Sequence, residues 1–87
     1  MLVLLQRAAR KYLERMNEPD KGHILAALAG LEKEPPLGDI KPIEGQENIY
    51  RLRVGKYRVL FYDEKNERII ANIEPRGQVY KKKNRRK

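Results

Sequence analysis

Three arginines, Arg51, Arg53 and Arg58, lie in a short segment that is rich in strand-forming residues. Because side chains alternate between the two faces of a strand, all three are expected on one face of a hairpin. Arg53 and Arg58 would then face each other directly, and like charges that face across strands cost stability. A guanidinium grips phosphate oxygens in a bidentate way, so this face favours an anionic ligand over a purely structural role.

The turn that brings these arginines together is predicted at Gly55–Lys56, a Gly-X pair typical of two-residue hairpin turns. It pairs Val54 with Tyr57 across the hairpin. The bulky residues share the second face, which we expect to be the core face: Tyr50, Leu52, Val54, Tyr57, Val59 and Phe61.

Composition limits the chain to one small core and excludes several kinds of site. Its 87 residues include no cysteine and one histidine, His23, which excludes disulfides, thiolate metal sites and the usual zinc clusters. We therefore expect no metal and no cofactor. The apolar run Met1–Leu5 meets Gln6 and Arg7 at once, too short for a membrane span or signal-peptide core, so a cytoplasmic protein without membrane contact is expected.

Positive charge is concentrated in the second half of the chain. Residues 1–48 carry seven Lys/Arg and eight Asp/Glu, a net charge of −1, whereas residues 49–87 carry thirteen Lys/Arg and four Asp/Glu, a net charge of +9. This asymmetry is typical of a surface that meets a polyphosphate, an anionic membrane or an acidic protein. Residues 81–87 are so basic that we expect them to form a flexible tail after a single domain over residues 1–80.

Two amphipathic helices are predicted before the hairpin. After a first strand at residues 1–5, apolar residues recur at helical spacing up to Met16, with charged residues between them. A second helix has its apolar stripe at Ile24, Ala27, Leu28 and Leu31. Residues 37–48 hold two glycines and a proline and are predicted to form a connecting loop.

The hydrophobic period then changes to two, which predicts strands near residues 49–54, 57–62 and 68–74. The resulting order β-α-α-β-β-β predicts an α+β fold. We expect the two helices to pack on one face of a small antiparallel sheet and to cover the apolar face of the hairpin. The arginine face would stay open.

The last predicted strand contributes to both faces of the sheet. Strict alternation places Ile69, Ala71 and Ile73 on the core face. It places Ile70, Asn72 and Glu74 on the arginine face. Glu74 is therefore a carboxylate that could act as a base beside the arginines.

The hairpin and the end of the chain resemble those of the RelE/ParE toxin superfamily. The segment Tyr50–Tyr62 is similar to the central hairpin of that superfamily, and Pro75–Tyr80 resembles the closing motif of its archaeal RelE-like branch. The resemblance implies a toxin of a type II toxin-antitoxin system. RelE-like members are ribosome-dependent endoribonucleases that cut mRNA in the decoding site, at the 16S rRNA, and a cognate antitoxin holds them inactive.

The resemblance also implies roles for individual residues. Arg58, Arg76 and Tyr80 match catalytic positions, where the arginines would stabilise the phosphorane formed by attack of a ribose 2′-hydroxyl. Tyr80 would stack on a base or take part in proton transfer. The residues expected to bind RNA are Arg51, Arg53, Lys56, Lys81 and Lys82. Some relatives use a histidine near the carboxyl terminus, which this chain lacks, so the histidine-based version of the mechanism is not implied.

Two other functions stay open beside the endoribonuclease. ParE-like members share the fold but inhibit DNA gyrase and have no nuclease activity. A catalytically silent relative that only binds RNA or the ribosome is the third possibility. All the matched basic and tyrosine positions are filled here, which favours the RelE-like function.

Overall fold

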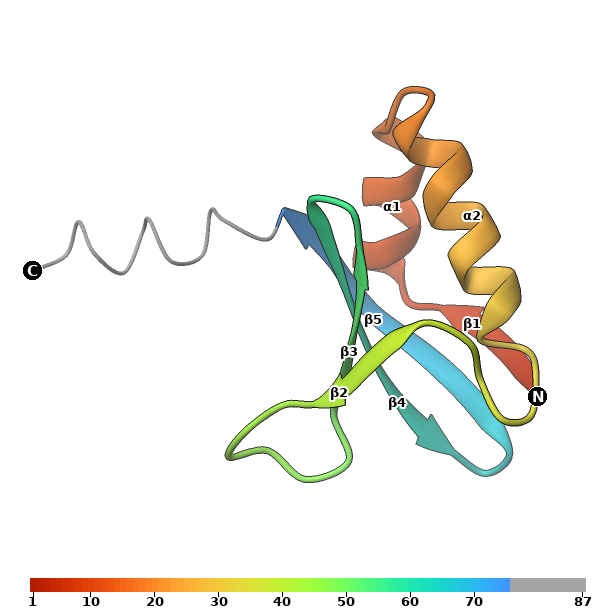
Figure 1. Ribbon diagram of the computed structural model, residues 1–87, viewed down its shortest axis with the longest axis vertical. Coiled ribbons are helices and arrows are strands. Elements are labelled where there is room, and N and C mark those ends of the chain that lie inside the picture. Colours follow the sequence, from red (N-terminus) through yellow and green to blue (C-terminus); the bar gives the residue numbers. More distant parts are fainter. Residues whose placement is uncertain (76–87) are drawn as a thin grey trace, which may run out of the picture.

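The computed structural model describes residues 1–75, in which two helices cover one face of a sheet (Figure 1). The helices are α1 (Arg7–Arg15) and α2 (Asp20–Gly30), and the strands are β1 (Leu2–Leu5), β2 (Asp39–Pro42), β3 (Tyr50–Val54), β4 (Tyr57–Glu64) and β5 (Glu67–Pro75). The strands lie in the order β1-β5-β4-β3-β2. The predicted α+β fold, with two helices on one face of a small sheet, is confirmed. No helix in these residues is long and apolar enough to cross a membrane.

Both edges of the sheet differ from the predicted arrangement. β1 lies parallel to β5, so the sheet is mixed. Both helices and three strands separate β1 from β5 in the sequence, which provides the long connection that parallel neighbours need. β2 pairs antiparallel with β3 inside residues 37–48, which were expected to form a loop. β2 has only four residues, of which Ile40 alone packs against the core, so its alternation is too short to stand out.

The β3–β4 hairpin has the predicted register, with Val54 opposite Tyr57 and Arg53 opposite Arg58. Gly55 has a φ of 57°, a backbone conformation that glycine adopts without steric cost. The apolar side chains of the hairpin lie in or against the core formed with α1 and α2, as expected. The hairpin therefore holds one face in the core and the arginine face outside it.

A β-bulge changes the face that β5 presents along its length. Leu60 pairs with Asn72, but the next residue, Phe61, pairs with Ile70, which leaves Ala71 as the extra residue. Ile73 is buried as predicted, whereas the prediction that Ile69 and Ala71 face the core is wrong. Ile70 takes that place because the bulge reverses the alternation.

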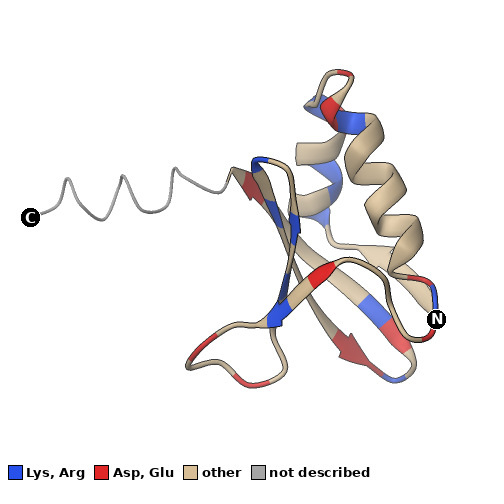
Figure 2. Cartoon of the chain, viewed as in Figure 1, with Lys and Arg blue, Asp and Glu red and all other residues tan. Residues whose placement is uncertain are grey.

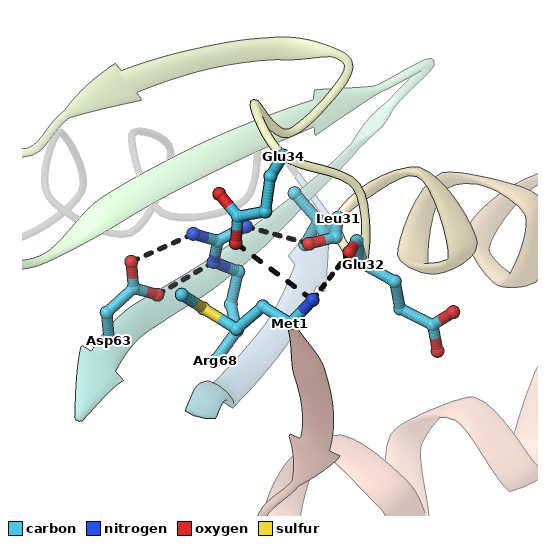
Figure 3. A network of polar contacts seen from close by, with 6 residues as sticks. All are labelled: Met1, Leu31, Glu32, Glu34, Asp63 and Arg68. Atoms are coloured by element: carbon cyan, nitrogen blue, oxygen red, sulfur yellow. Dashed lines mark hydrogen bonds and ion pairs between the residues drawn. The ribbon is translucent and has the colours of Figure 1, made fainter. Parts of the chain in front are cut away.

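The bulge also turns Arg68 inward, where its side chain is only 5% exposed. Figure 3 shows its guanidinium between Asp63 and the carbonyl oxygen of Leu31. Nε and Nη2 donate to the two oxygens of Asp63 at 2.7 and 2.9 Å, and Nη1 donates to Leu31 at 2.7 Å. These hydrogen bonds to Asp63 raise the pKa of Arg68. Arg68 thus ties β4 and β5 to the end of α2.

Candidate functional site

Four charged residues form one row across the open face of the sheet. Asp39 on β2 is opposite Arg53 on β3, and Arg53 is opposite Arg58 on β4. Arg58 in turn is opposite Glu74 on β5. Residues directly opposite share a face, so the row alternates as acid, base, base, acid. Figure 2 shows basic residues along the β3–β4 hairpin and acidic residues on β2 and β5.

Arg58 makes one strong contact and keeps unused donors. Its Nη2 donates to Oε2 of Glu74 at 2.9 Å, and the two side chains are 20% and 22% exposed. Nε of Arg58 is buried and has no hydrogen-bond partner among the described residues. A guanidinium carries five N–H donors, so the single bond to Glu74 leaves other donors of Arg58 without a partner among the described residues, and of these Nε is closed to solvent.

Arg51 and Arg53 both meet Asp39, but with different exposure. Arg51 donates to the backbone oxygen of Asp39 at 3.1 Å and lies 3.5 Å from its carboxylate. Nε of Arg53 is 4.0 Å from the same carboxylate. Arg51 is 14% exposed and Arg53 47%. Arg51 therefore connects β2 to β3, while Arg53 extends into solvent.

The structure confirms that Arg53 and Arg58 lie opposite each other. The acidic residues beside them correct the inference that was drawn from their repulsion. Repulsion between Arg53 and Arg58 was expected to favour an anionic ligand. Asp39 and Glu74 place opposite charges at both ends of the same row, so the row has no net charge. Asp39 was missed because its segment was assigned to a loop; the short alternation Asp39-Ile40-Lys41 is the only signal for it.

Lys56 lies away from this row, on the turn at the tip of the hairpin. Its side chain is 77% exposed, and Nζ is 3.9 Å from Oδ2 of Asp20 at the start of α2. The same oxygen accepts a hydrogen bond from the hydroxyl of Tyr57 at 2.9 Å. That bond, with burial as a smaller cause, raises the pKa of Tyr57. The hairpin tip is thereby joined to the helical layer.

Four predicted site residues lie outside the described part of the chain: Arg76, Tyr80, Lys81 and Lys82. β5 ends at Pro75, directly before the first of them. Within residues 1–75, no group of three His, Cys, Asp or Glu residues is placed to hold a metal ion. The described face offers arginine donors for hydrogen bonding and charge stabilisation, and the carboxylates of Asp39 and Glu74.

An apolar band adjoins the charged row on the same face. It comprises Leu2, Leu4, Leu60, Tyr62 and Ile69. Leu4 pairs with Ile69 and Ile69 with Tyr62, so these side chains cross β1, β5 and β4 together. Leu2 and Leu4 are exposed, and the other three are partly buried. The open face thus has an apolar part and a charged part.

Comparison with known proteins places this arrangement among toxins. Residues 3–80 match the family model described as "ParE toxin of type II toxin-antitoxin system, parDE". No curated protein matches the sequence.

Several solved structures share the fold. A chain of an archaeal RelE-RelB complex from Pyrococcus horikoshii OT3 is 26% identical, with a TM-score of 0.75 over 88% of this chain and 96% of that one. A chain of the RelB-RelE antitoxin-toxin complex from Methanococcus jannaschii is 23% identical, with a TM-score of 0.74 over 91% and 96%. A YoeB/ParE toxin from Agrobacterium tumefaciens is 13% identical, with a TM-score of 0.71 over 86% and 98%.

Proposed function

Because the chain belongs to the ParE toxin family of the RelE/ParE superfamily, we propose that this type II toxin is a ribosome-dependent endoribonuclease that cuts mRNA. The observation that carries the proposal is the side-by-side pair Arg53 and Arg58, whose guanidinium groups lie on the open face. The Arg58 side chain is 20% exposed and makes one side-chain hydrogen bond among the described residues, to Glu74. The 26% identity to an archaeal RelE-RelB structure supports this choice within the superfamily.

The proposed reaction is attack by a ribose 2′-hydroxyl on the adjacent phosphate. A bond forms between O2′ and phosphorus, the bond to the 5′-oxygen breaks, and the proton lost from O2′ is replaced by one gained at the 5′-oxygen. Arg58 stabilises the added negative charge of the phosphorane, because its N–H donors can bind two phosphate oxygens. Arg53 holds a neighbouring phosphate, and Arg51 keeps β2 in place beside it.

Arg76 and Tyr80 complete this proposal from the sequence resemblance alone. An unperturbed tyrosine has a pKa near 10, so the Tyr80 hydroxyl is a poor base at neutral pH. A site that lacks a well-tuned acid and base depends on orientation of its substrate. We therefore propose that the ribosome supplies that orientation, as in the RelE-like branch.

The partner that we propose for the open face is a cognate antitoxin. The Pyrococcus and Methanococcus relatives were both solved as RelE and RelB together. The apolar band beside the Arg53–Arg58 pair suits a segment with one apolar stripe and acidic side chains next to it. Such a segment would cover the arginines and block RNA.

The decisive test is primer extension on a defined mRNA incubated with the toxin, with and without programmed ribosomes. We expect cuts that require ribosomes and that disappear with Arg58→Ala. Arg10→Ala is the matched control, because Arg10 is a 55% exposed arginine of α1, in the helical layer on the other face. Cuts that persist with Arg58→Ala would refute the assignment of Arg58.

Inhibition of DNA gyrase is the second candidate, since the matching family model is that of ParE toxins. It predicts growth inhibition on expression without new mRNA ends, and loss of supercoiling by purified gyrase. RNA binding without cuts, with no effect on growth, would instead indicate a catalytically silent relative.

A further inference from the structure

We propose that Asp39 and Glu74 set the RNA affinity of the open face by occupying the arginines that an RNA phosphate must bind. This inference rests on the proposed function, because it concerns the same RNA-contact surface. In it the two carboxylates are competitors of the ligand, and their removal strengthens RNA binding.

The placement of the carboxylates carries the first step. Glu74 lies opposite Arg58, and its Oε2 accepts the one side-chain hydrogen bond that Arg58 makes among residues 1–75. Asp39 lies opposite Arg53, 4.0 Å from its Nε. Each carboxylate therefore stands where a phosphate oxygen would meet the guanidinium.

The form of these contacts shows that they can be exchanged. Glu74 offers one oxygen to Arg58, whereas bidentate pairing would use two. The Asp39–Arg53 pair has no hydrogen bond, and both side chains are about half exposed. Exposed ion pairs such as Asp39–Arg53 contribute little stability, and a phosphate that binds two donors of Arg58 would replace the single bond that Glu74 makes.

Stability and RNA affinity should therefore respond in opposite directions. Without Glu74, Arg58 loses its partner and still faces Arg53, so the folded state loses a compensating charge. The same loss frees Arg58 for phosphate. A residue with a purely structural role would lower stability without raising affinity.

The experiment measures binding of a short fluorescent single-stranded RNA to the full chain over a range of salt concentrations. The variants are Glu74→Gln and Asp39→Asn, with Glu64→Gln as the matched control. Glu64 is on the same strand as Arg58, six residues away, which is about 20 Å along a strand and beyond the Debye length at 0.1 M salt. The control therefore makes the same change in net charge without freeing an arginine of the row.

We expect Glu74→Gln to tighten RNA binding about 2- to 5-fold and Asp39→Asn somewhat less, against little change for Glu64→Gln. The slope of log K against log salt should steepen by about 0.7 for each arginine that gains a phosphate. The urea midpoint of Glu74→Gln should fall while that of Glu64→Gln stays.

Two outcomes would overturn the inference. If the three variants bind RNA as tightly as one another, or if Glu74→Gln binds less tightly than the wild type, the carboxylates do not compete with phosphate. The proposed function is then decided separately by the primer-extension test. If neither the wild type nor any variant binds RNA, the inference is wrong; if ribosome-dependent cuts are also missing, the endoribonuclease function is wrong as well.

Discussion

Two arginines on neighbouring strands, Arg68 on β5 and Arg58 on β4, differ in their hydrogen bonds and in their exposure. Arg68 uses Nε, Nη1 and Nη2 in hydrogen bonds of 2.7–2.9 Å and is almost fully buried. Arg58 makes one such bond, leaves Nε without a partner among the described residues and is 20% exposed. A buried arginine with all three nitrogens hydrogen-bonded fixes structure, whereas the single bond and partial exposure of Arg58 suit the binding role proposed for it.

Removing Arg68 should give the largest effect. Arg68→Ala leaves Asp63 and the carbonyl oxygen of Leu31 without their donor, and loss of one partner of a buried ion pair costs about 3–5 kcal/mol. Because Asp63 is partly exposed, we expect about 3 kcal/mol less free energy of unfolding in urea. Arg53→Ala, at a half-exposed arginine, should change it by less than about 1 kcal/mol. Equal urea midpoints for Arg68→Ala and Arg53→Ala would contradict the distinction between a buried structural arginine and an exposed one.

Removing Arg58 should have the converse result, a large effect on activity and a small one on stability. Loss of one donor to a developing anion typically lowers rates by about 10²- to 10³-fold, so we expect Arg58→Ala to cut mRNA at least that much more slowly on the ribosome. The free energy of unfolding should fall by less than in Arg68→Ala, because Arg58 makes one side-chain hydrogen bond among the described residues and its removal relieves the repulsion from Arg53. If Arg58→Ala loses activity only to the extent that it is unfolded, Arg58 has a structural role.

A smaller effect should come from Gly38, the residue before β2. Its φ is +127°, and a Cβ there would lie 2.5 Å from Cδ1 of the buried Leu52. We expect Gly38→Ala to cost about 1–3 kcal/mol and to displace β2 with Asp39. Gly45→Ala is the control, since Gly45 also has a positive φ but nothing within 4 Å of the added atom. If the two variants unfold alike, strain at φ and not the contact with Leu52 explains the loss.

The smallest effect is expected at Tyr57, which supports the hairpin from the helical side. Its bond to Asp20 raises its pKa above the unfolded value of 10.0. The stabilisation is then complete below pH 10 and lost as pH rises through the folded pKa. Tyr57→Phe should therefore be less stable at pH 8 and lose less stability between pH 9 and 11. Parallel curves of stability against pH would rule out this contribution of Tyr57.

The sequence predicted local features better than contacts between distant segments. Gly55–Lys56 determines the hairpin register within a few residues, so the opposition of Arg53 and Arg58 followed from turn chemistry. The pairing of β1 with β5 joins residues more than sixty positions apart, and no local pattern specifies it. β2 is too short for alternation to reveal it, and with β2 the sequence prediction missed Asp39.

The bulge was equally hidden, because Ile69 and Ile70 are both plausible core residues. Only packing against Phe61 decides which of them turns inward. The predicted site therefore contained the arginines but not their acidic neighbour Asp39, and the predicted core lacked Ile70. Arg68 has no distinguishing spacing, and its role depends on the same bulge.

That bulge makes β5 two short strands in opposite phase, joined at Ala71. Before it, the inward positions hold Arg68 and Ile70; after it, Ile73 points inward and Glu74 outward. A deletion of Ala71 would remove the bulge and leave Arg68, Ile70 and Ile73 in regular alternation on the core face, with Glu74 still facing outward. An insertion or deletion in β5 that keeps the bulge would instead move Arg68 or Glu74 to the opposite face, so related chains that lack the bulge should be one residue shorter between these two positions.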